Sequence, residues 1–546
     1  MVTAFLFGVM GVLVFLFYWA RQKQMNVFRQ LGIPGPSPNF LFGNLLHFVR
    51  TPVYQAYLDW QHKYGDNFGY FEGPTPILVT SDLEILKQVF LTKFNKFSTR
   101  KLFPVQVDPE KDDDVHMFFA QGERWRRLRA IINPAFSGAK LKKLSPRINA
   151  QLDVLIQQMD KLKQTGESFD IQRLYERLTL DVITNCGFGL EAEALKNPKD
   201  PFLERCRGVL ESTTRFSILF LLGFTFPTLH AVWIAIYTYI GKLYGNPLFW
   251  LEDNLARVIE MRKIQQVKQR DLLQLMLDSE CQTVGEARRN SHDIGLSRIP
   301  VRPYVAHDCH DEVPDSVQLM DKNLNYYAPK KPLKVLSSEE VKAQCLLFLL
   351  AGYETTSTAL SYLTYELSVN QDIQRRLQHE VDDYFPAQES QPCFTTVQEL
   401  PFLEMVWCET LRKYPVAANV IARQCLETCV VNGVTVYRDM LVQANVYAVH
   451  NNEEIWGENT RKFDPDRFLP ERRKGRHCMA WLPFGAGYRS CIGARLAIME
   501  AKMAMVRIMK KFTIVPTEKS QVPIKLVEGA TLSPETVHVK LIERTR

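Results

Sequence analysis

The sequence predicts a mainly α-helical fold with small β-sheets, preceded by a single N-terminal transmembrane helix. Residues 2–20 carry no charge, which is typical of a membrane span. Helical periodicity dominates from about 122 to 268 and again from 337 to 370, while β-rich runs such as 75–80 are short. Strands and helices do not alternate regularly, so a doubly wound parallel sheet is not expected.

Composition narrows the class of protein further. The chain has 546 residues, of which 46% are apolar and 23% charged, with a net charge of +7. This charge is modest for the length and no nucleic-acid-binding motif is present, so we expect no nucleic-acid partner. The 11 cysteines show no Cys-x-x-Cys pair, which indicates reduced thiols rather than a disulfide framework.

The N-terminal segment 1–20 is interpreted as an uncleaved signal anchor. As a helix it is about 28 Å long, close to the hydrocarbon thickness of a bilayer. Arg21, Lys23 and Arg29 follow it directly and favour a cytosolic location for the rest of the chain. A buried core helix is the alternative.

Three further segments complete the predicted organisation. A basic, proline-rich hinge is expected over 21–38, followed by one catalytic domain over 39–546. Residues 217–240 form a second uncharged run, which we interpret as a surface element dipping into the bilayer rather than a second span. Proline-rich residues 281–335 predict a long exposed insertion, and its His307-Asp-Cys-His310 lacks the rigid surroundings of a metal site.

A long helix is predicted from Ser337 to about Asn370. Ser337 and Glu340 form a capping box, and no helix-stopping signal follows for roughly 33 residues. Its apolar interior is interrupted by Gly352, Glu354 and a pair of threonines, although glycine costs a helix about 1 kcal/mol and a buried carboxylate costs more. This polar interruption therefore indicates function.

A glycine-rich loop around Cys491 is the second unusual feature. The stretch 484–493 reads Phe-Gly-Ala-Gly-Tyr-Arg-Ser-Cys-Ile-Gly, and it precedes a predicted final helix. A thiolate at a helix N-terminus, with Arg489 nearby, would suit a soft metal ligand. A small buried thiol or a cysteine nucleophile are alternatives, whereas a dinucleotide loop is excluded because no βαβ unit surrounds it.

The loop resembles the haem-binding signature of the cytochrome P450 family, Phe-x-x-Gly-x-Arg-x-Cys-x-Gly. The resemblance implies the cytochrome P450 fold and haem b, iron protoporphyrin IX, as the cofactor. Cys491 would be the axial ligand of the haem iron. The cofactor-binding loop would then include Phe484, Gly487, Arg489 and Gly493.

Other motifs agree with this resemblance. Glu409-Thr-Leu-Arg412 is similar to the family's Glu-x-x-Arg, and the stretch 465–468, Pro-Asp-Arg-Phe, to its Pro-x-Arg-Phe. The spacing of Glu409 and Arg412 places them on one helix face. By the resemblance, Glu409, Arg412 and Arg467 form a structural triad and take no part in the chemistry.

Five residues are expected to contact the haem propionates. Trp125 and Arg129 match the family's Trp-x-x-x-Arg, in which residues four apart on a helix can converge on one carboxylate. Arg489 should meet the same anionic edge. Arg100 and Arg423 fall where related enzymes place further propionate contacts.

Glu354 and Thr355 match the family's catalytic acid and alcohol. Oxygen cleavage by a monooxygenase consumes protons, so its site needs a hydroxyl with an acid behind it. The Thr355 hydroxyl can bond the carbonyl four residues back and loosen the helix, while Gly352 would leave room for oxygen and water. A helix bend without a catalytic role is the alternative.

The pair of Glu354 and Thr355 favours a monooxygenase. We expect its substrate to be hydrophobic, such as a steroid, a lipid or a xenobiotic. The resemblance is nearest to the animal clan of steroid- and drug-oxidising enzymes and thromboxane synthase. An isomerase of a fatty-acid endoperoxide needs no proton relay, and a non-catalytic haem-binding sensor would have a closed site; both stay as alternatives.

The chain carries no flavin or NAD fingerprint, so its electrons must come from a partner. The family implies NADPH–cytochrome P450 reductase, with cytochrome b5 as a second donor, at the endoplasmic reticulum membrane. The protein would be single-pass and in contact with membrane lipid. Arg124, Arg126, Arg127 and the basic run 472–476 could form the docking surface for an acidic partner.

Overall fold

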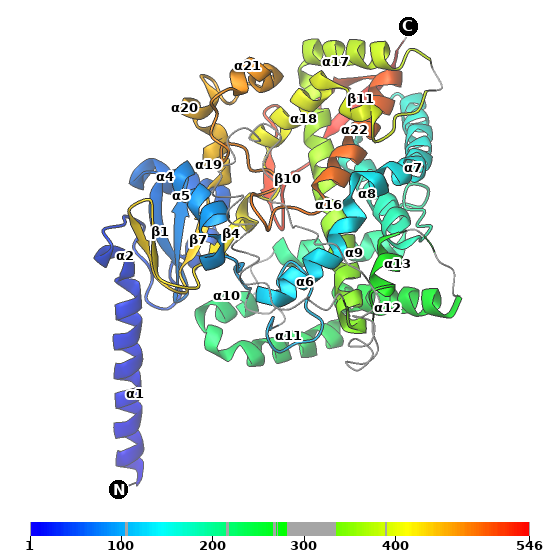
Figure 1. Cartoon of the computed structure of the whole chain (residues 1–546). Coiled ribbons are helices and arrows are strands. Elements are labelled where there is room, and N and C mark those ends of the chain that lie inside the picture. Colours follow the sequence, from blue (N-terminus) through cyan, green and yellow to red (C-terminus); the bar gives the residue numbers. More distant parts are fainter. Residues whose placement is uncertain are drawn as a thin grey trace, which may run out of the picture. The chain divides into compact units, whose positions relative to one another are not determined.

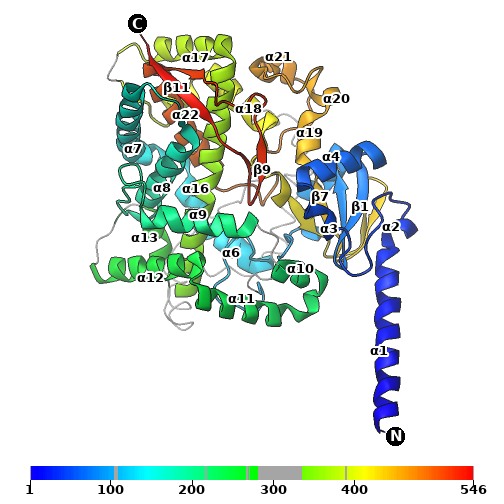
Figure 2. The same cartoon turned by 180° about the vertical axis from the view of Figure 1, so that it is seen from behind.

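The computed structural model contains two compact units, each built from several stretches of the chain (Figures 1 and 2). The first unit comprises Met1–Gln106, Phe216–Ile240 and Ala418–Val449, and the second comprises Val107–Arg215, Gly241–Ala417 and His450–Arg546. The structure describes residues 2–103, 108–214, 218–265, 269, 271–280, 335–387 and 390–544. Most of the predicted insertion at 281–335, including His307–His310, lies outside the described residues.

The N-terminal helix α1 spans Val2–Met25 and is long and apolar enough to cross a membrane over Phe5–Met25. Almost none of this stretch is buried against protein, which fits the prediction of a transmembrane helix. The helix continues five residues beyond the predicted anchor. Near its end Arg21 is buried, and its Nε donates a hydrogen bond to the Phe40 carbonyl at 2.9 Å.

The first unit contains a mixed sheet of four strands in the order β1-β2-β7-β4. Antiparallel β1 and β2 pair Asn67 with Thr80, and β2 runs parallel to β7, pairing Ile77 with Leu441. Consecutive apolar residues, as in the run Thr75–Thr80, place apolar side chains on both faces of the sheet. Both faces are therefore buried. The strands are β1 (Asn67–Glu72), β2 (Thr75–Thr80), β4 (Ala422–Gln424) and β7 (Leu441–Ala444), with a separate hairpin of β5 (Cys429–Val431) and β6 (Val434–Val436).

Short helices flank this sheet. They are α2 (Val27–Gln30), α3 (Leu45–Phe48), α4 (Val53–Tyr64), α5 (Leu83–Lys87), η1 (Gln88–Thr92), η2 (Phe94–Lys96), η4 (Pro227–Leu229) and η7 (Ala418–Val420). The second apolar run forms α10 (Ile218–Thr225) and the start of α11 (His230–Tyr244), which are bent by 111° at Pro227. This run is therefore not a straight helix, and its contact with a membrane stays a prediction.

The second unit is mainly helical. Its helices are α6 (Gly122–Ile132), η3 (Asn133–Phe136), α7 (Gly138–Thr165), α8 (Ile171–Phe188), α9 (Pro201–Thr214), α12 (Pro247–Gln265), α13 (Leu272–Leu277), α16 (Ser338–Val369), α17 (Gln371–Tyr384), η6 (Thr396–Gln398), α18 (Pro401–Lys413), α20 (Glu453–Trp456), η8 (Pro465–Phe468), α21 (Pro470–Arg473) and α22 (Ala494–Lys511). Helix α19 (Val446–Asn451) crosses the boundary between the units.

Two small sheets complete the second unit. Three strands, β3 (Phe169–Asp170), β11 (His538–Glu543) and β8 (Phe512–Pro516), pair antiparallel in that order. A hairpin joins β9 (Leu526–Glu528) to β10 (Leu532–Pro534), pairing Leu532 with Glu528. The prediction of a mainly α fold with small sheets is confirmed.

The long helix α16 has the boundaries that its capping box predicts. The Ser337 hydroxyl accepts a hydrogen bond from the Glu340 amide at 3.1 Å, and the Glu340 carboxylate accepts one from the Ser337 amide at 3.2 Å. The last helical residue is Val369.

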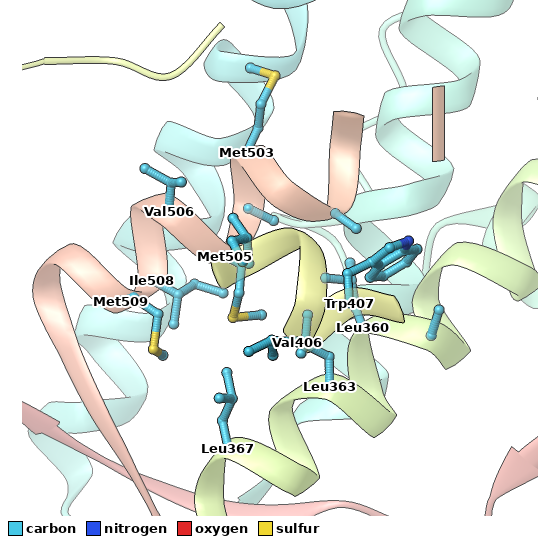
Figure 3. Close-up of a cluster of buried hydrophobic side chains, with 14 of the residues drawn as sticks. Leu360, Leu363, Leu367, Val406, Trp407, Met503, Met505, Val506, Ile508 and Met509 are labelled. Carbon is cyan, nitrogen blue, oxygen red and sulfur yellow. The ribbon is translucent and has the colours of Figure 1, made fainter. Parts of the chain in front are cut away.

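Apolar side chains of α16, α18 and α22 form a core that fixes the site-bearing helices (Figure 3). Leu360 of α16 lies near Trp407 of α18, Leu363 lies near Val406, and methionines of α22 belong to the same core. Each fully buried leucine of this kind stabilises the fold by roughly 1.5–3 kcal/mol. Residues on α16 are therefore held rigidly relative to the helix that follows the cysteine loop.

Candidate functional site

The loop 484–493 is turned so that a cysteine thiol is exposed ahead of helix α22. Gly485 and Gly487 adopt left-handed backbone angles, with φ of 67° and 72°, which side chains disfavour. The Cys491 amide donates a hydrogen bond to the Phe484 carbonyl at 2.9 Å and closes the loop. The thiol lies near the positive end of the α22 dipole, which favours a thiolate.

Two buried arginines contribute positive charge here, Arg489 within the loop and Arg129 on helix α6 beside it. The Arg489 guanidinium is 4.4 Å from the centre of the Trp125 ring, and its Nη2 donates to the Ala120 carbonyl at 2.7 Å. Arg129 donates through Nη1 to the Ser490 carbonyl at 2.9 Å. The structure thus brings the predicted residues Trp125, Arg129 and Arg489 together around the segment that carries the cysteine.

Arg129 still has hydrogen-bonding capacity to offer. Its Nε is buried and has no hydrogen-bond partner within the part of the chain that the structure describes. Burial lowers the pKa of Arg129 to about 10, and the nearby Cys491 opposes that shift. A buried, incompletely paired cation of this kind is suited to an anionic ligand group.

The polar interruption of α16 contains an alcohol and a partly buried acid. The Thr355 hydroxyl donates to the Ala351 carbonyl at 2.7 Å, as predicted, although the helix runs on without a break. The Glu354 Oε1 accepts a hydrogen bond from Thr531 at 2.8 Å. Burial raises the pKa of Glu354, the Thr531 hydroxyl opposes that rise, and the charge of Glu176 adds to it.

Gly352 has a packing role that the sequence did not reveal. A Cβ atom at this position would lie 3.1 Å from Cδ1 and Cγ1 of Ile183 on α8. Beside it, the Thr179 hydroxyl donates to the Tyr353 carbonyl at 2.7 Å. The prediction that Gly352 leaves room for oxygen and water is therefore wrong on this face, because the side chain of α8 occupies that space.

Glu409, Arg412 and Arg467 form a buried charge cluster. Arg412 donates to both carboxylate oxygens of Glu409, at 2.6 and 2.8 Å, and the Arg467 Nε lies 3.7 Å from Glu409 Oε1. The Glu409 and Arg412 side chains have no exposed surface. Arg412 also donates to the carbonyls of His450 and Thr460, each at 2.7 Å. The cluster thus joins α18 to the segments around residues 450 and 460.

Comparison with known proteins accounts for this combination of motifs. The family model for cytochrome P450 matches residues 33–297 and 308–541. The chain belongs to the cytochrome P450 family. Thromboxane-A synthase from Sus scrofa is 31% identical over 98% of this chain and 96% of its own length. Cytochrome P450 3A2 from Rattus norvegicus is 31% identical over 96% of this chain and 94% of its own length. The putative cytochrome P450 CYP13A3 from Caenorhabditis elegans is 31% identical over 94% of this chain and 94% of its own length.

Membership of this family indicates a haem protein with oxidoreductase or related chemistry, and members of the family typically take electrons from a redox partner. The donors at the site fit such a cofactor. The exposed thiol of Cys491 can bind iron, and the buried Nε of Arg129 can donate to a propionate.

Arg100 and Arg423 both lie in the first unit. Arg100 donates through Nη1 to the Val420 carbonyl at 3.2 Å. Arg423 is 1% exposed, and its guanidinium lies 4.6 Å from the centre of the Phe90 ring. Their contact with the propionates stays a prediction.

Two arginines of the predicted basic docking surface of this P450 form ion pairs with one carboxylate. Arg124 Nε and Arg127 Nη2 lie 2.9 and 2.6 Å from Glu340 Oε1. Burial disfavours the Glu340 charge, but Arg127 and Arg124 outweigh it and lower the pKa of this carboxyl. Both arginines therefore stabilise the capped end of α16, and their part in docking stays a prediction.

His450 supports the loop through contacts that no sequence motif indicates. Its Nδ1 lies 3.2 Å from the Arg412 carbonyl, and its Nε2 accepts a hydrogen bond from the Leu482 amide at 2.8 Å. This pattern requires a neutral ring protonated on Nδ1. Burial, followed by the charge of Arg412, lowers the pKa of His450 to about 3. The ring connects the charge cluster to the entrance of the cysteine loop.

We expect Glu409→Gln to destabilise the protein by about 3–5 kcal/mol, because it leaves the charge of Arg412 buried without its counter-ion. The loss would be measured as haem content and as thermal inactivation of the purified protein. Glu399→Gln, at an exposed position, is the matched control. Equal haem content in the two variants would contradict this account.

Stability should depend on pH through His450. Below pH 6.5 the unfolded chain takes up a proton that the folded ring refuses, so stability falls as pH decreases from 6.5 towards 3 and is constant above 6.5. The slope should be about 1.4 kcal/mol per pH unit. His450→Gln should remove this part of the dependence and His62→Gln, at an exposed position, should keep it. Thermal unfolding followed at several pH values measures both slopes.

Proposed function

We propose that this P450 is a membrane-bound haem-thiolate monooxygenase. It would insert one O2-derived oxygen atom into a hydrophobic steroid, lipid or xenobiotic, with electrons from NADPH delivered through a reductase. The observation that carries the proposal is the pairing of Glu354 and Thr355 on α16. Glu354, a carboxyl whose pKa is raised by burial, directly precedes Thr355 in the sequence, and a half-buried hydroxyl with an acid behind it is what proton delivery requires.

We propose haem b as the cofactor. Cys491 would be the axial ligand, and the glycine-rich turn with Phe484, Gly487 and Gly493 would let the backbone approach the ring closely. Propionates would be bound by Arg129, Arg489 and Trp125, with Arg100 and Arg423 as further contacts. When bound, the haem would supply oxygen activation, which thiolate ligation favours.

The residues of α16 would manage the protons. The Glu354 carboxyl would release a proton and recover it from solvent. The Thr355 hydroxyl, which donates to the Ala351 carbonyl, can accept a hydrogen bond at the same time. These two groups can therefore form the inner end of a chain of hydrogen bonds that reaches water.

An endoperoxide isomerase and a haem-binding sensor are the alternatives. The similarity to thromboxane-A synthase does not favour the isomerase, because the identity to cytochrome P450 3A2 is the same 31%. An isomerase has no use for a proton donor, and a sensor has no use for an acid and alcohol pair. The retention of Glu354 and Thr355 is the feature that separates these functions.

We infer that NADPH–cytochrome P450 reductase supplies the electrons, with cytochrome b5 as a second donor. The body would lie on the cytosolic side of the endoplasmic reticulum membrane, held by α1 as the single span. Arg472 and Lys474 have exposed side chains and Arg126 a half-buried one, and the carboxylate that pairs with Arg472, that of Asp464, is itself partly exposed. They are the residues to reverse when docking is tested.

Thr355→Ala should lower product formed per NADPH consumed by about tenfold or more, because proton delivery fails while electron input continues. The assay uses full-length protein with the reductase and a substrate chosen by spectral titration of steroids, lipids and xenobiotics. Thr355→Ser retains the hydroxyl and should recover most of the coupling. Full coupling in Thr355→Ala would refute the proton-delivery role, and product formation without NADPH would indicate the isomerase.

A further inference from the structure

Thr531 makes a long-range contact with the acid of α16 that neither motif reveals. Its hydroxyl donates a 2.8 Å hydrogen bond to Glu354 Oε1, across 177 positions in the sequence. Thr531 is 5% exposed and lies in the turn between β9 and β10. The turn is closed by the Gly529 amide, which donates to the Thr531 carbonyl at 2.8 Å. The hydroxyl is therefore presented by an ordered turn.

The hairpin that carries Thr531 is fixed to α16 at a second point, and β10 lies beside this helix (Figure 1). The Leu532 amide donates to the Val416 carbonyl at 2.8 Å, and the Leu532 carbonyl accepts from the Tyr362 hydroxyl at 3.0 Å. Tyr362 is two turns further along α16 than Glu354, and its ring stacks on Tyr414 at 4.3 Å. These contacts leave the Thr531 side chain little freedom to move away from the acid.

The hydrogen bond holds only one end of the Glu354 carboxyl group. Oε1 is held by Thr531, whereas Oε2 accepts no hydrogen bond from protein among the described residues. The charge that acts on Glu354 from a neighbouring helix is that of Glu176 on α8, which pairs with Arg207 of α9 at 2.7 Å. Because Glu354 is half-buried rather than fully buried, its second oxygen can accept a hydrogen bond from water.

We propose that Thr531 is the positioning residue for the acid: its hydroxyl fixes Glu354 Oε1 and leaves Oε2 to exchange a proton with water and the Thr355 hydroxyl. This inference rests on the proposed function, in which Glu354 supplies protons. It assigns to the β9–β10 hairpin a direct influence on proton delivery, through a residue outside the acid and alcohol motif.

Electrostatics supports the same assignment. A hydroxyl that donates to a carboxylate stabilises the charged form, so Thr531 lowers the pKa of Glu354 against the effects of burial and of Glu176. Removing the hydroxyl should raise the pH at which Glu354 loses its proton. The wild-type contact thus combines a fixed orientation with a proton that can be released.

The experiment compares Thr531→Val, which removes the hydroxyl at nearly constant volume, with Thr531→Ser, which retains it. Infrared spectra recorded against pH give the titration of the protonated carboxyl band, with Glu354→Gln identifying which band belongs to this residue. Product formed per NADPH consumed is measured on the same samples. Haem content and the CO-bound spectrum control for folding.

We expect Thr531→Val to shift the Glu354 band to higher pH and to lower coupling about tenfold, while Thr531→Ser resembles the wild type in both. If Glu354→Gln loses coupling but Thr531→Val matches the wild type in both measurements, this inference is overturned and the proposed function stands. If Glu354→Gln stays fully coupled, the proposed role of the acid fails whatever Thr531 does. Equal losses in Thr531→Val and Thr531→Ser would overturn the role of the hydroxyl.

Discussion

The buried guanidinium of Arg412 is the interaction on which the surroundings of the cysteine loop depend. Removing an ion of this kind from water costs several kcal/mol unless its donors are paired with good geometry. Arg412 meets this requirement with both oxygens of Glu409 and with the carbonyls of His450 and Thr460. Because the pairing fails if any of these segments moves, a single cation fixes α18 and two later stretches of chain relative to one another. His450 then extends this order to Leu482, two residues before the loop begins.

The two halves of the chemistry need opposite electrostatic surroundings, and the second unit provides both. Around Cys491, the helix dipole of α22 and the cations Arg129 and Arg489 favour a negative ligand. On α16, burial raises the pKa of Glu354, and no cationic side chain among the described residues pairs with it, so it keeps a proton more readily than an exposed carboxyl does. In both places it is the setting rather than the residue type that determines the behaviour of an ordinary side chain.

The sequence predicted what depends on local or signature patterns. The apolar α1 and the capping box of α16 follow from neighbouring residues, and the cysteine loop is a short motif. Contacts between distant segments could not be predicted: nothing near Thr531 or His450 in the chain announces their partners. The same reason explains one error and one missed contact. The sequence does not place Ile183 beside Gly352, and it does not show that Arg124 and Arg127 pair with Glu340, which lies more than 200 positions away.

We propose that Cys491, held as a thiolate by this charged and hydrogen-bonded loop, binds the haem iron. The most direct measurement is the absorption spectrum of the full-length protein after reduction and exposure to CO, compared with that of Cys491→His. We expect a thiolate-type Soret band in the wild type. The band should be absent in Cys491→His, in which the introduced imidazole still binds the haem. A thiolate-type band that persists in Cys491→His would mean that another cysteine is the ligand and would contradict the account.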